Sequence, residues 1–122
     1  MRSWKQIWSQ KSVRNLSNIS LQDLILANGY DTGVGSYNVK NWRFMVADFC
    51  SKTALQPDCK ILEIGCGSGA FLYALNEIFK VECYGVDYSE SLIQVAKAAI
   101  PNGEFKSQPA NQPSDFNTSF DL

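Results

Sequence analysis

The sequence predicts an α/β fold in which a parallel sheet follows a helical N-terminal region. Two short apolar segments, 60–64 and 81–86, have the length and composition of buried strands, and a segment with helical periodicity follows each. A glycine-rich turn, 65–69, joins the first strand to its helix. Strands that alternate with helices form right-handed crossovers. We therefore expect a parallel sheet with helices on both faces.

The composition is that of one ordinary globular domain or part of one. The chain has 122 residues, of which 45% are hydrophobic and 19% charged, and its net charge is −1. This charge argues against binding of phosphate backbones as the main role. No apolar run approaches the roughly 20 residues that cross a bilayer, and the N-terminus lacks the apolar stretch of a signal peptide. We expect a cytoplasmic protein with no nucleic-acid or membrane partner and leave its oligomeric state open.

Histidine is absent, and the four cysteines are Cys50, Cys59, Cys66 and Cys83. Without a C-x-x-C pair or a histidine, no metal site is expected, and the thiols are interpreted as reduced, buried, small hydrophobic groups. The absence of histidine also excludes Ser–His and Cys–His nucleophiles from this chain.

Residues 1–56 are predicted to form a helical extension. Trp4, Ile7 and Trp8 fall on one helical face, and we interpret this face as packing over the main body rather than binding a membrane or a partner. Ser20 is a candidate N-cap for a second helix that ends near Asn28-Gly29.

The remainder of the extension is predicted to be a loop and a third helix. The glycine-rich stretch 31–37 lacks apolar periodicity and is typical of a loop. Apolar residues recur with helical spacing from Asn38 to Ser51-Lys52, and Pro57 closes the segment.

From residue 57 onward the pattern changes to alternating strands and helices. The first strand, 60–64, leads through the glycine turn into a helix over 70–79. The second strand ends at Asp87, and Ser89 or Ser91 is a candidate cap for the helix that Pro101 ends.

Two further strands are indicated near the end of the sequence. Residues 104–106 are a candidate third strand, and residues 120–122 resemble the start of a fourth. We therefore expect an incomplete sheet in a chain that is part of a longer protein.

The glycine turn is compatible with two classes of nucleoside ligand. A glycine-rich turn between a strand and a helix lets a ligand approach the backbone, and the helix N-terminus offers N–H groups to a carboxylate or phosphate. Gly65-x-Gly-x-x-Ala70 satisfies the dinucleotide pattern, and Asp87 lies at the expected distance for contact with ribose hydroxyls. The turn alone does not separate NAD from other nucleosides.

The flanking residues favour one class. Glu63-x-Gly-x-Gly-x-Gly69 resembles motif I of the class I S-adenosylmethionine (SAM)-dependent methyltransferases, and Tyr84-Gly-Val-Asp-Tyr-Ser89 resembles the second-strand motif of that family. The resemblance spans about residues 58–100 and implies a Rossmann-like sheet, incomplete here and preceded by N-terminal helices. The nearly 60 residues before the first strand agree with it, because dinucleotide domains commonly begin close to that strand.

The resemblance implies a role for each residue around the turn. Gly65, Gly67 and Gly69 would form the loop against which the methionine part of SAM lies, with the backbone around Cys66 facing the ligand. Glu63 would hold the α-amino group, directly or through water. The alternative for Glu63 is an ordinary polar residue at a strand end.

The same resemblance implies contacts with the adenosine part and with the carboxylate. Asp87 would accept hydrogen bonds from both ribose hydroxyls, and Tyr88 would flank the adenine, unless it is a core aromatic residue. Asn111 is the candidate for the adenine amino group, although the family often has an acid there. Tyr37 or Tyr30 would reach the methionine carboxylate, and either is equally explained as a packing residue.

The resemblance implies a SAM-dependent methyltransferase that acts on a small-molecule acceptor. Residues 57–122 would form the partial SAM-binding domain, and residues 1–56 its extension or lid. We assign no catalytic residue, because the acceptor-side residues of the family mostly follow the fourth strand. The alternatives are a non-catalytic fragment that binds SAM or another nucleoside, and an NAD-binding oxidoreductase fragment.

Overall fold

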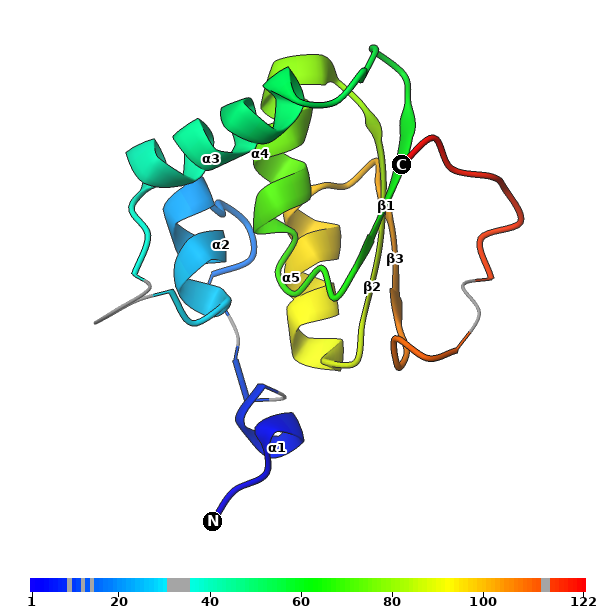
Figure 1. The fold of residues 1–122 in the computed structure, drawn as a ribbon. Coiled ribbons are helices and arrows are strands. Elements are labelled where there is room, and N and C mark those ends of the chain that lie inside the picture. The colour runs from blue at the N-terminus through cyan, green and yellow to red at the C-terminus, as the bar shows by residue number, and fades with distance from the viewer. Residues whose placement is uncertain (9, 12, 14, 31–35, 113–114) are drawn as a thin grey trace.

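The computed structural model describes residues 1–8, 10, 11, 13, 15–30, 36–112 and 115–122 (Figure 1). Most of the predicted loop over 31–37 lies outside the described residues. The three helices predicted for the N-terminal part are present: α1 (Trp4–Trp8), α2 (Leu21–Ala27) and α3 (Val39–Ser51).

Side-chain caps fix where two of these helices begin. The Ser20 hydroxyl accepts a hydrogen bond from the backbone N–H of Asp23, and the Asp23 carboxylate accepts one from the Ser20 N–H, which completes a capping box. The Asn38 side chain accepts a hydrogen bond from the N–H of Asn41 at 2.8 Å. Both caps satisfy N–H groups that a helix start leaves without an intrahelical partner.

Three parallel strands, in the order β1-β2-β3, form the sheet: β1 (Lys60–Ile64), β2 (Glu82–Asp87) and β3 (Glu104–Ser107). Helix α4 (Ala70–Phe79) connects β1 to β2, and α5 (Glu90–Ala99) connects β2 to β3. The register places Ile64 opposite Val86 and Asp87 opposite Ser107, so the carboxyl ends of the strands meet at one edge of the sheet. The predicted α/β class with a Rossmann-like parallel sheet is confirmed.

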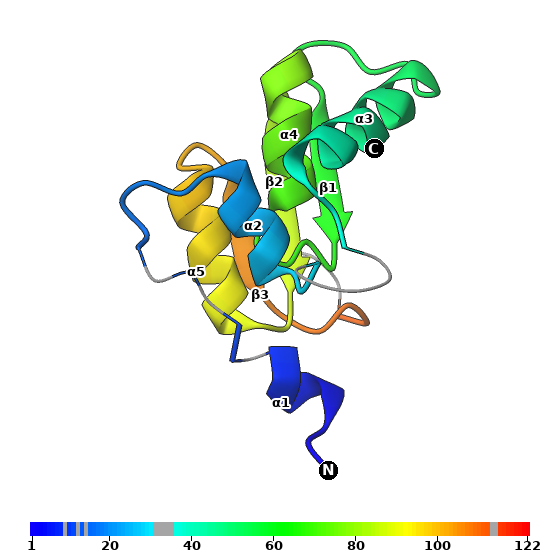
Figure 2. The ribbon, with the colours of Figure 1, turned by 90° about the vertical axis from the view of Figure 1, so that its left-hand side faces the viewer.

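The two faces of the sheet are covered by different structures (Figures 1 and 2). Ile61, Cys83 and Phe105 belong to the main core, which includes buried residues of α2, α3, α4 and α5. Both crossovers step in the same direction across the sheet, and right-handed crossovers of that kind put α4 and α5 on the same face. On the other face, Tyr84 packs edge-to-face against Phe116 and Phe120.

Residues 120–122, the predicted start of a fourth strand, lie along the edge of β1 that faces away from β2. The N–H of Leu62 donates to the carbonyl of Leu122 at 2.9 Å, and the N–H of Asp121 donates to the carbonyl of Lys60 at 2.8 Å. The Asp121 carboxylate also accepts a hydrogen bond from the N–H of Lys60. Near Lys60, this edge of β1 is therefore covered by the chain itself.

All four cysteines are free thiols, and Cys50, Cys66 and Cys83 are buried. Among the described residues, no group of three or more His, Cys, Asp or Glu side chains is arranged to hold a metal ion. The helices within the described part of the chain are all too short or too polar to cross a membrane.

Gly85 in β2 lies where the sheet leaves no space for a side chain. A Cβ atom there would lie 2.7 Å from Cys66 Sγ and 2.7 Å from Phe105 Cδ1. We expect Gly85→Ala to lower the free energy of unfolding by about 1–3 kcal/mol, because overpacking forces neighbours to move. Urea unfolding followed by circular dichroism measures this change. Unchanged stability would show that the β2 neighbourhood adapts without cost.

Candidate functional site

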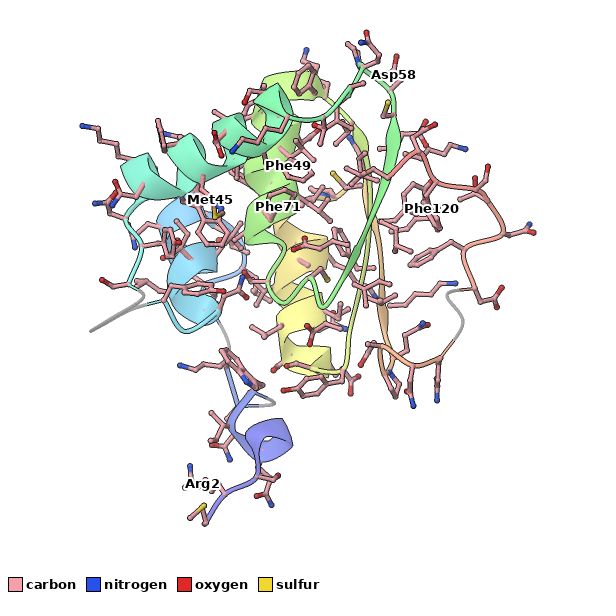
Figure 3. The ribbon with its side chains drawn as sticks, in the orientation of Figure 1. Arg2, Met45, Phe49, Asp58, Phe71 and Phe120 are labelled. Atoms are coloured by element: carbon pink, nitrogen blue, oxygen red, sulfur yellow. The ribbon has the colours of Figure 1, made fainter. Side chains whose placement is uncertain are left out.

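A pocket of about 340 Å³ opens at the carboxyl ends of β1 and β2. Its polar wall contains the glycine turn and the two strand-end acids: Glu63, Gly65, Cys66, Gly67 and Asp87. Its aromatic wall combines the N-terminal region with α4 and the end of β2: Trp8, Tyr30, Trp42, Phe71 and Tyr88. Phe71 of α4 also packs edge-to-face on Phe49 of α3, with ring centroids 5.1 Å apart (Figure 3).

The turn between β1 and α4 has a conformation that requires glycine. Gly65, Gly67 and Gly69 all have positive φ angles, of +77°, +53° and +83°. This left-handed region is strained for residues with a Cβ atom. At Gly67 the space is closed as well, because a Cβ there would lie 2.3 Å from the side-chain oxygen of Asn28.

All five backbone N–H groups of the turn, from 65 to 69, donate within the protein. Gly67 donates to Asp87 Oδ2 at 3.0 Å, and Ser68 donates to Asn28 Oδ1 at 2.8 Å. Gly65 and Cys66 donate to the carbonyl of Val86, and Gly69 donates to that of Cys66. Asp87 and Asn28 therefore occupy two of these N–H groups, and backbone carbonyls occupy the other three.

Glu63, the residue before the last of β1, has a carboxylate that lines the pocket. Its Oε2 atom is buried and has no hydrogen-bond partner among the described residues. Burial, together with the negative charge of Asp87, raises the pKa of Glu63 to about 8. A cationic ligand in the pocket would reverse this effect by stabilising the carboxylate.

Asp87 ends β2 and holds its carboxylate between two backbone donors. Oδ2 accepts from the N–H of Gly67, and Oδ1 accepts from the N–H of Ser89 at 2.8 Å. Each carboxylate oxygen can accept a second hydrogen bond. Asp87 is therefore oriented by the protein and retains two acceptor positions for a ligand.

Cys66 lines the same pocket but is not a nucleophile there. Burial raises the pKa of its thiol, and the carboxylates of Glu63 and Asp87 raise it further. The thiol therefore stays protonated at neutral pH, and protonated thiols react slowly.

The structure brings together most, but not all, of the predicted site residues. Glu63, Gly65, Cys66, Gly67, Asp87 and Tyr88 line the pocket, and Tyr88 is 38% exposed rather than a core residue. Gly69 lies outside this lining and is buried close to Ala96 of α5.

The two peripheral candidates are placed differently. Tyr30 lines the pocket, whereas Tyr37 is not in the described lining and packs on Tyr30 and Trp42 with ring centroids 5.5 Å apart. Asn111 is exposed in the loop after β3 and is also outside the lining.

Sequence reasoning missed several pocket residues, all from outside the two motifs. Trp8 and Asn28 come from the N-terminal region, and Trp42, Phe71 and Leu92 come from α3, α4 and α5. The helix-ending Asn28-Gly29 pair was visible in the sequence, but its contact with the glycine turn was not. Trp8 was expected to pack on the main body, and its backbone carbonyl does accept a hydrogen bond from Ser89 Oγ.

The pocket has a negative electrostatic character. Glu63 and Asp87 lie in its wall, and no Lys or Arg is among the described residues that line it. Neutral donors and aromatic rings complete the lining. This arrangement suits a ligand that carries positive charge and hydroxyl groups better than one that carries phosphates.

Comparison with known proteins gives one family match and similarity to the solved structures of two enzymes. Residues 55–122 match the family model described as a methyltransferase domain. The plantazolicin methyltransferase BpumL, solved with a desmethylPZN analog and SAH, shares 22% identity over 66% of this chain with a TM-score of 0.51. Coclaurine N-methyltransferase bound to N-methylheliamine and SAH shares 16% identity over 96% of this chain with a TM-score of 0.62. A search of curated proteins found no match.

These structural similarities concern the fold. This chain spans 31% of the BpumL chain and 38% of the coclaurine N-methyltransferase chain. The second match extends over almost the whole of this chain, so it includes residues of the N-terminal helical region.

Proposed function

The chain belongs to the methyltransferase domain family, and from this premise we propose that it is the cofactor-binding part of a SAM-dependent methyltransferase. One observation carries the proposal: the buried Oε2 of Glu63 has no partner in a pocket that contains a second acid and no described basic residue. Buried carboxylates require a partner. A cationic nucleoside supplies one.

The pocket residues fit the separate parts of SAM. Glu63 would bind the α-ammonium group, and the two remaining acceptor positions of Asp87 would bind the ribose hydroxyls. Gly65, Cys66 and Gly67 supply a close-lying backbone wall, and Tyr88 supplies a ring for the adenine. Asn111 and Tyr37 remain candidates from the sequence pattern, although neither is in the described lining.

The same chemistry argues against the NAD alternative. A pyrophosphate is usually bound by free N–H groups at a glycine turn or by basic side chains. In this turn the five N–H groups of residues 65–69 are already bonded within the protein. The Asp87 carboxylate in the wall would also repel a dianion, and Glu63 would add to this repulsion when it is ionised.

When bound, SAM supplies a methyl group on a positively charged sulfur, which is an activated group for in-line transfer. The task of this chain's residues is to hold the cofactor and to exclude water from it. The aromatic wall of Trp8, Tyr30, Trp42, Phe71 and Tyr88 suits that task, because aromatic faces attract cations and displace water. No residue of this chain is proposed as an acid or base for the acceptor.

The acceptor is proposed to be a small molecule, and the protein is proposed to be cytoplasmic. In this proposal residues 57–122 carry the cofactor contacts, and residues 1–56 cover the pocket through Trp8, Asn28 and Tyr30. A non-catalytic SAM-binding role is the alternative. Incubation of the protein with methyl-labelled SAM and candidate acceptors separates these two roles.

Thermal unfolding of the chain with each ligand tests the cofactor assignment. A ligand that binds only the folded state at a hundredfold excess over its Kd stabilises that state by about 2.7 kcal/mol. SAM and S-adenosylhomocysteine (SAH) are expected to raise the Tm, and NAD is expected to leave it unchanged. A shift with NAD alone would contradict the assignment, and so would a cooperative transition that no ligand shifts.

Proton release accompanies binding if Glu63 holds the ammonium group. At pH 7 a carboxyl group with a pKa of about 8 is mostly protonated, and a bound cation favours its ionised form. We expect SAH binding to release close to one proton at pH 7 and almost none at pH 9. Titration calorimetry in two buffers with different ionisation enthalpies measures this number, with Glu63→Gln as the control. Equal heats in both buffers at pH 7 would contradict the contact.

A further inference from the structure

The carboxylate of an amino-acid ligand has few available donors in this pocket. None of the described lining residues is a Lys or Arg, and the N–H groups of residues 65–69 are already bonded. The indole N–H of Trp42 donates to the carbonyl of Ala70 at 3.1 Å. A carboxylate bound beside residues 65–69 would therefore use donors from other segments, among them the neutral side chains of the lining.

Asn28 is such a donor, and we propose that its side-chain amide binds the carboxylate of the cofactor's amino-acid part. The inference rests on the proposed function, because it takes SAM as the ligand. It adds a specificity-determining residue that lies outside both sequence motifs, 40 residues along the chain from the turn that it contacts.

Two hydrogen bonds fix the position of Asn28. It caps α2, and its Oδ1 accepts from the N–H of Ser68 at 2.8 Å. The fully buried Ser68 hydroxyl donates to the carbonyl of Leu24 at 2.7 Å, so the glycine turn and the end of α2 are joined at two points. This double connection holds Asn28 in the pocket wall.

The same contacts fix which atom of Asn28 is available. A backbone N–H requires an acceptor, so the oxygen faces Ser68 and the Nδ2 group, with two hydrogens, faces elsewhere. No hydrogen-bond partner of Nδ2 is present in the described part of the chain. Nδ2 lies 3.4 Å from the position that a Cβ on Gly67 would occupy, which places it beside the turn.

Asn28 and Glu63 together match a zwitterion. Glu63 has an unpartnered carboxylate oxygen, Asn28 has unpartnered amide hydrogens, and both residues line the same pocket. An α-amino acid presents an ammonium and a carboxylate on one carbon atom. The pair therefore recognises the amino-acid end of the ligand, while Asp87 recognises the ribose.

Asn28→Asp tests the inference, because it keeps an acceptor for the N–H of Ser68 and removes the donor. Affinities for SAH and for 5′-methylthioadenosine, which lacks the amino-acid part, are measured by titration calorimetry. We expect SAH to bind at least tenfold more weakly and 5′-methylthioadenosine to change less than twofold. Asn102→Asp, the same change at an exposed position outside the pocket, is expected to alter neither affinity.

Three outcomes would overturn the inference. An equal loss of affinity for SAH and for 5′-methylthioadenosine would mean that Asn28 only supports the turn. Binding of 5′-methylthioadenosine to the variant serves as the control that its pocket is folded. Unchanged SAH affinity in Asn28→Asp, with a loss in Tyr30→Phe, would assign the carboxylate to Tyr30. If the unaltered chain is folded and binds neither ligand, the proposed function fails first, and this inference fails with it.

Discussion

Asp87→Ala is expected to weaken SAH binding by at least two orders of magnitude. Asp87 Oδ1 and Oδ2 each hold one backbone N–H and can each accept one ribose hydroxyl. A hydrogen bond to a charged group contributes about 1.5–3 kcal/mol, so the loss of two corresponds to roughly 10² to 10⁴ in affinity. The substitution also releases the N–H of Gly67 and so loosens the turn.

Two further variants help to separate the loss of the ribose contacts from the loosening of the turn. Asp87→Asn keeps the shape and one side-chain oxygen but removes the charge, so an intermediate affinity is expected. Asp48→Ala on α3 removes an exposed acid that pairs with Lys52, and it is expected to leave SAH affinity unchanged. Titration calorimetry gives all three values. An Asp87→Ala protein that unfolds cooperatively and binds SAH as tightly as the parent would rule out the ribose contact.

Glu63→Gln is expected to change stability and binding in opposite directions. The pKa of Glu63 is raised from 4.5 to about 8, so the folded state binds the proton more tightly than the unfolded state does. Below about pH 4.5 this group therefore does not lower the free energy of unfolding. As the pH rises from there toward 8, the free energy of unfolding falls, because the proton is lost more readily from the unfolded state. Glutamine removes that loss, while it also removes the partner of the ligand's ammonium group.

The size of the effect follows from the pKa difference. Because Glu63 is only partly buried as a residue, we expect a gain on the order of 1–3 kcal/mol at pH 8.5 rather than the full value of the shift. At pH 4.5 the variant and the parent are expected to be nearly equal. SAH affinity at pH 8.5 is expected to fall at least tenfold, since a charged partner is lost.

Urea unfolding at the two pH values and calorimetry at pH 8.5 measure these quantities. Glu77→Gln, which changes an exposed acid paired with Arg43, serves as the matched control. A Glu63→Gln protein that is less stable than the parent at pH 8.5 would show that the carboxylate is satisfied in the folded state. A more stable protein with unchanged SAH affinity would remove Glu63 from the ligand contacts.

The local features of this fold were predictable from the sequence because short-range chemistry sets them. Ser20 and Asn38 cap their helices, the apolar segment 60–64 forms a strand, and the turn at 65–69 needs glycine for its positive φ angles. The carboxyl ends of parallel strands meet at one edge, so the proximity of Glu63 to Asp87 also follows from the pattern.

The contacts made by the N-terminal region were not predictable in the same way. Asn28 reaches Ser68 across 40 residues, and the carbonyl of Trp8 reaches Ser89 across 81. No periodicity or cap signal specifies such a pairing, which depends on how α2 packs on α4 and where α1 lies relative to Ser89. The bond of Asn28 to the Ser68 N–H is a consequence of the same packing, whereas Asp87 reaches the Gly67 N–H from the end of β2.

Titration of the folded chain with SAH, followed by competition with NAD, is the most direct test of the cofactor assignment. We expect one SAH molecule to bind per chain, with proton release at pH 7, and NAD at millimolar concentration to leave the SAH isotherm unchanged. Binding that is lost in Asp87→Ala would locate SAH in the pocket at the carboxyl ends of β1 and β2. A cooperatively folded chain that binds NAD in place of SAH, or that binds neither, would contradict the assignment.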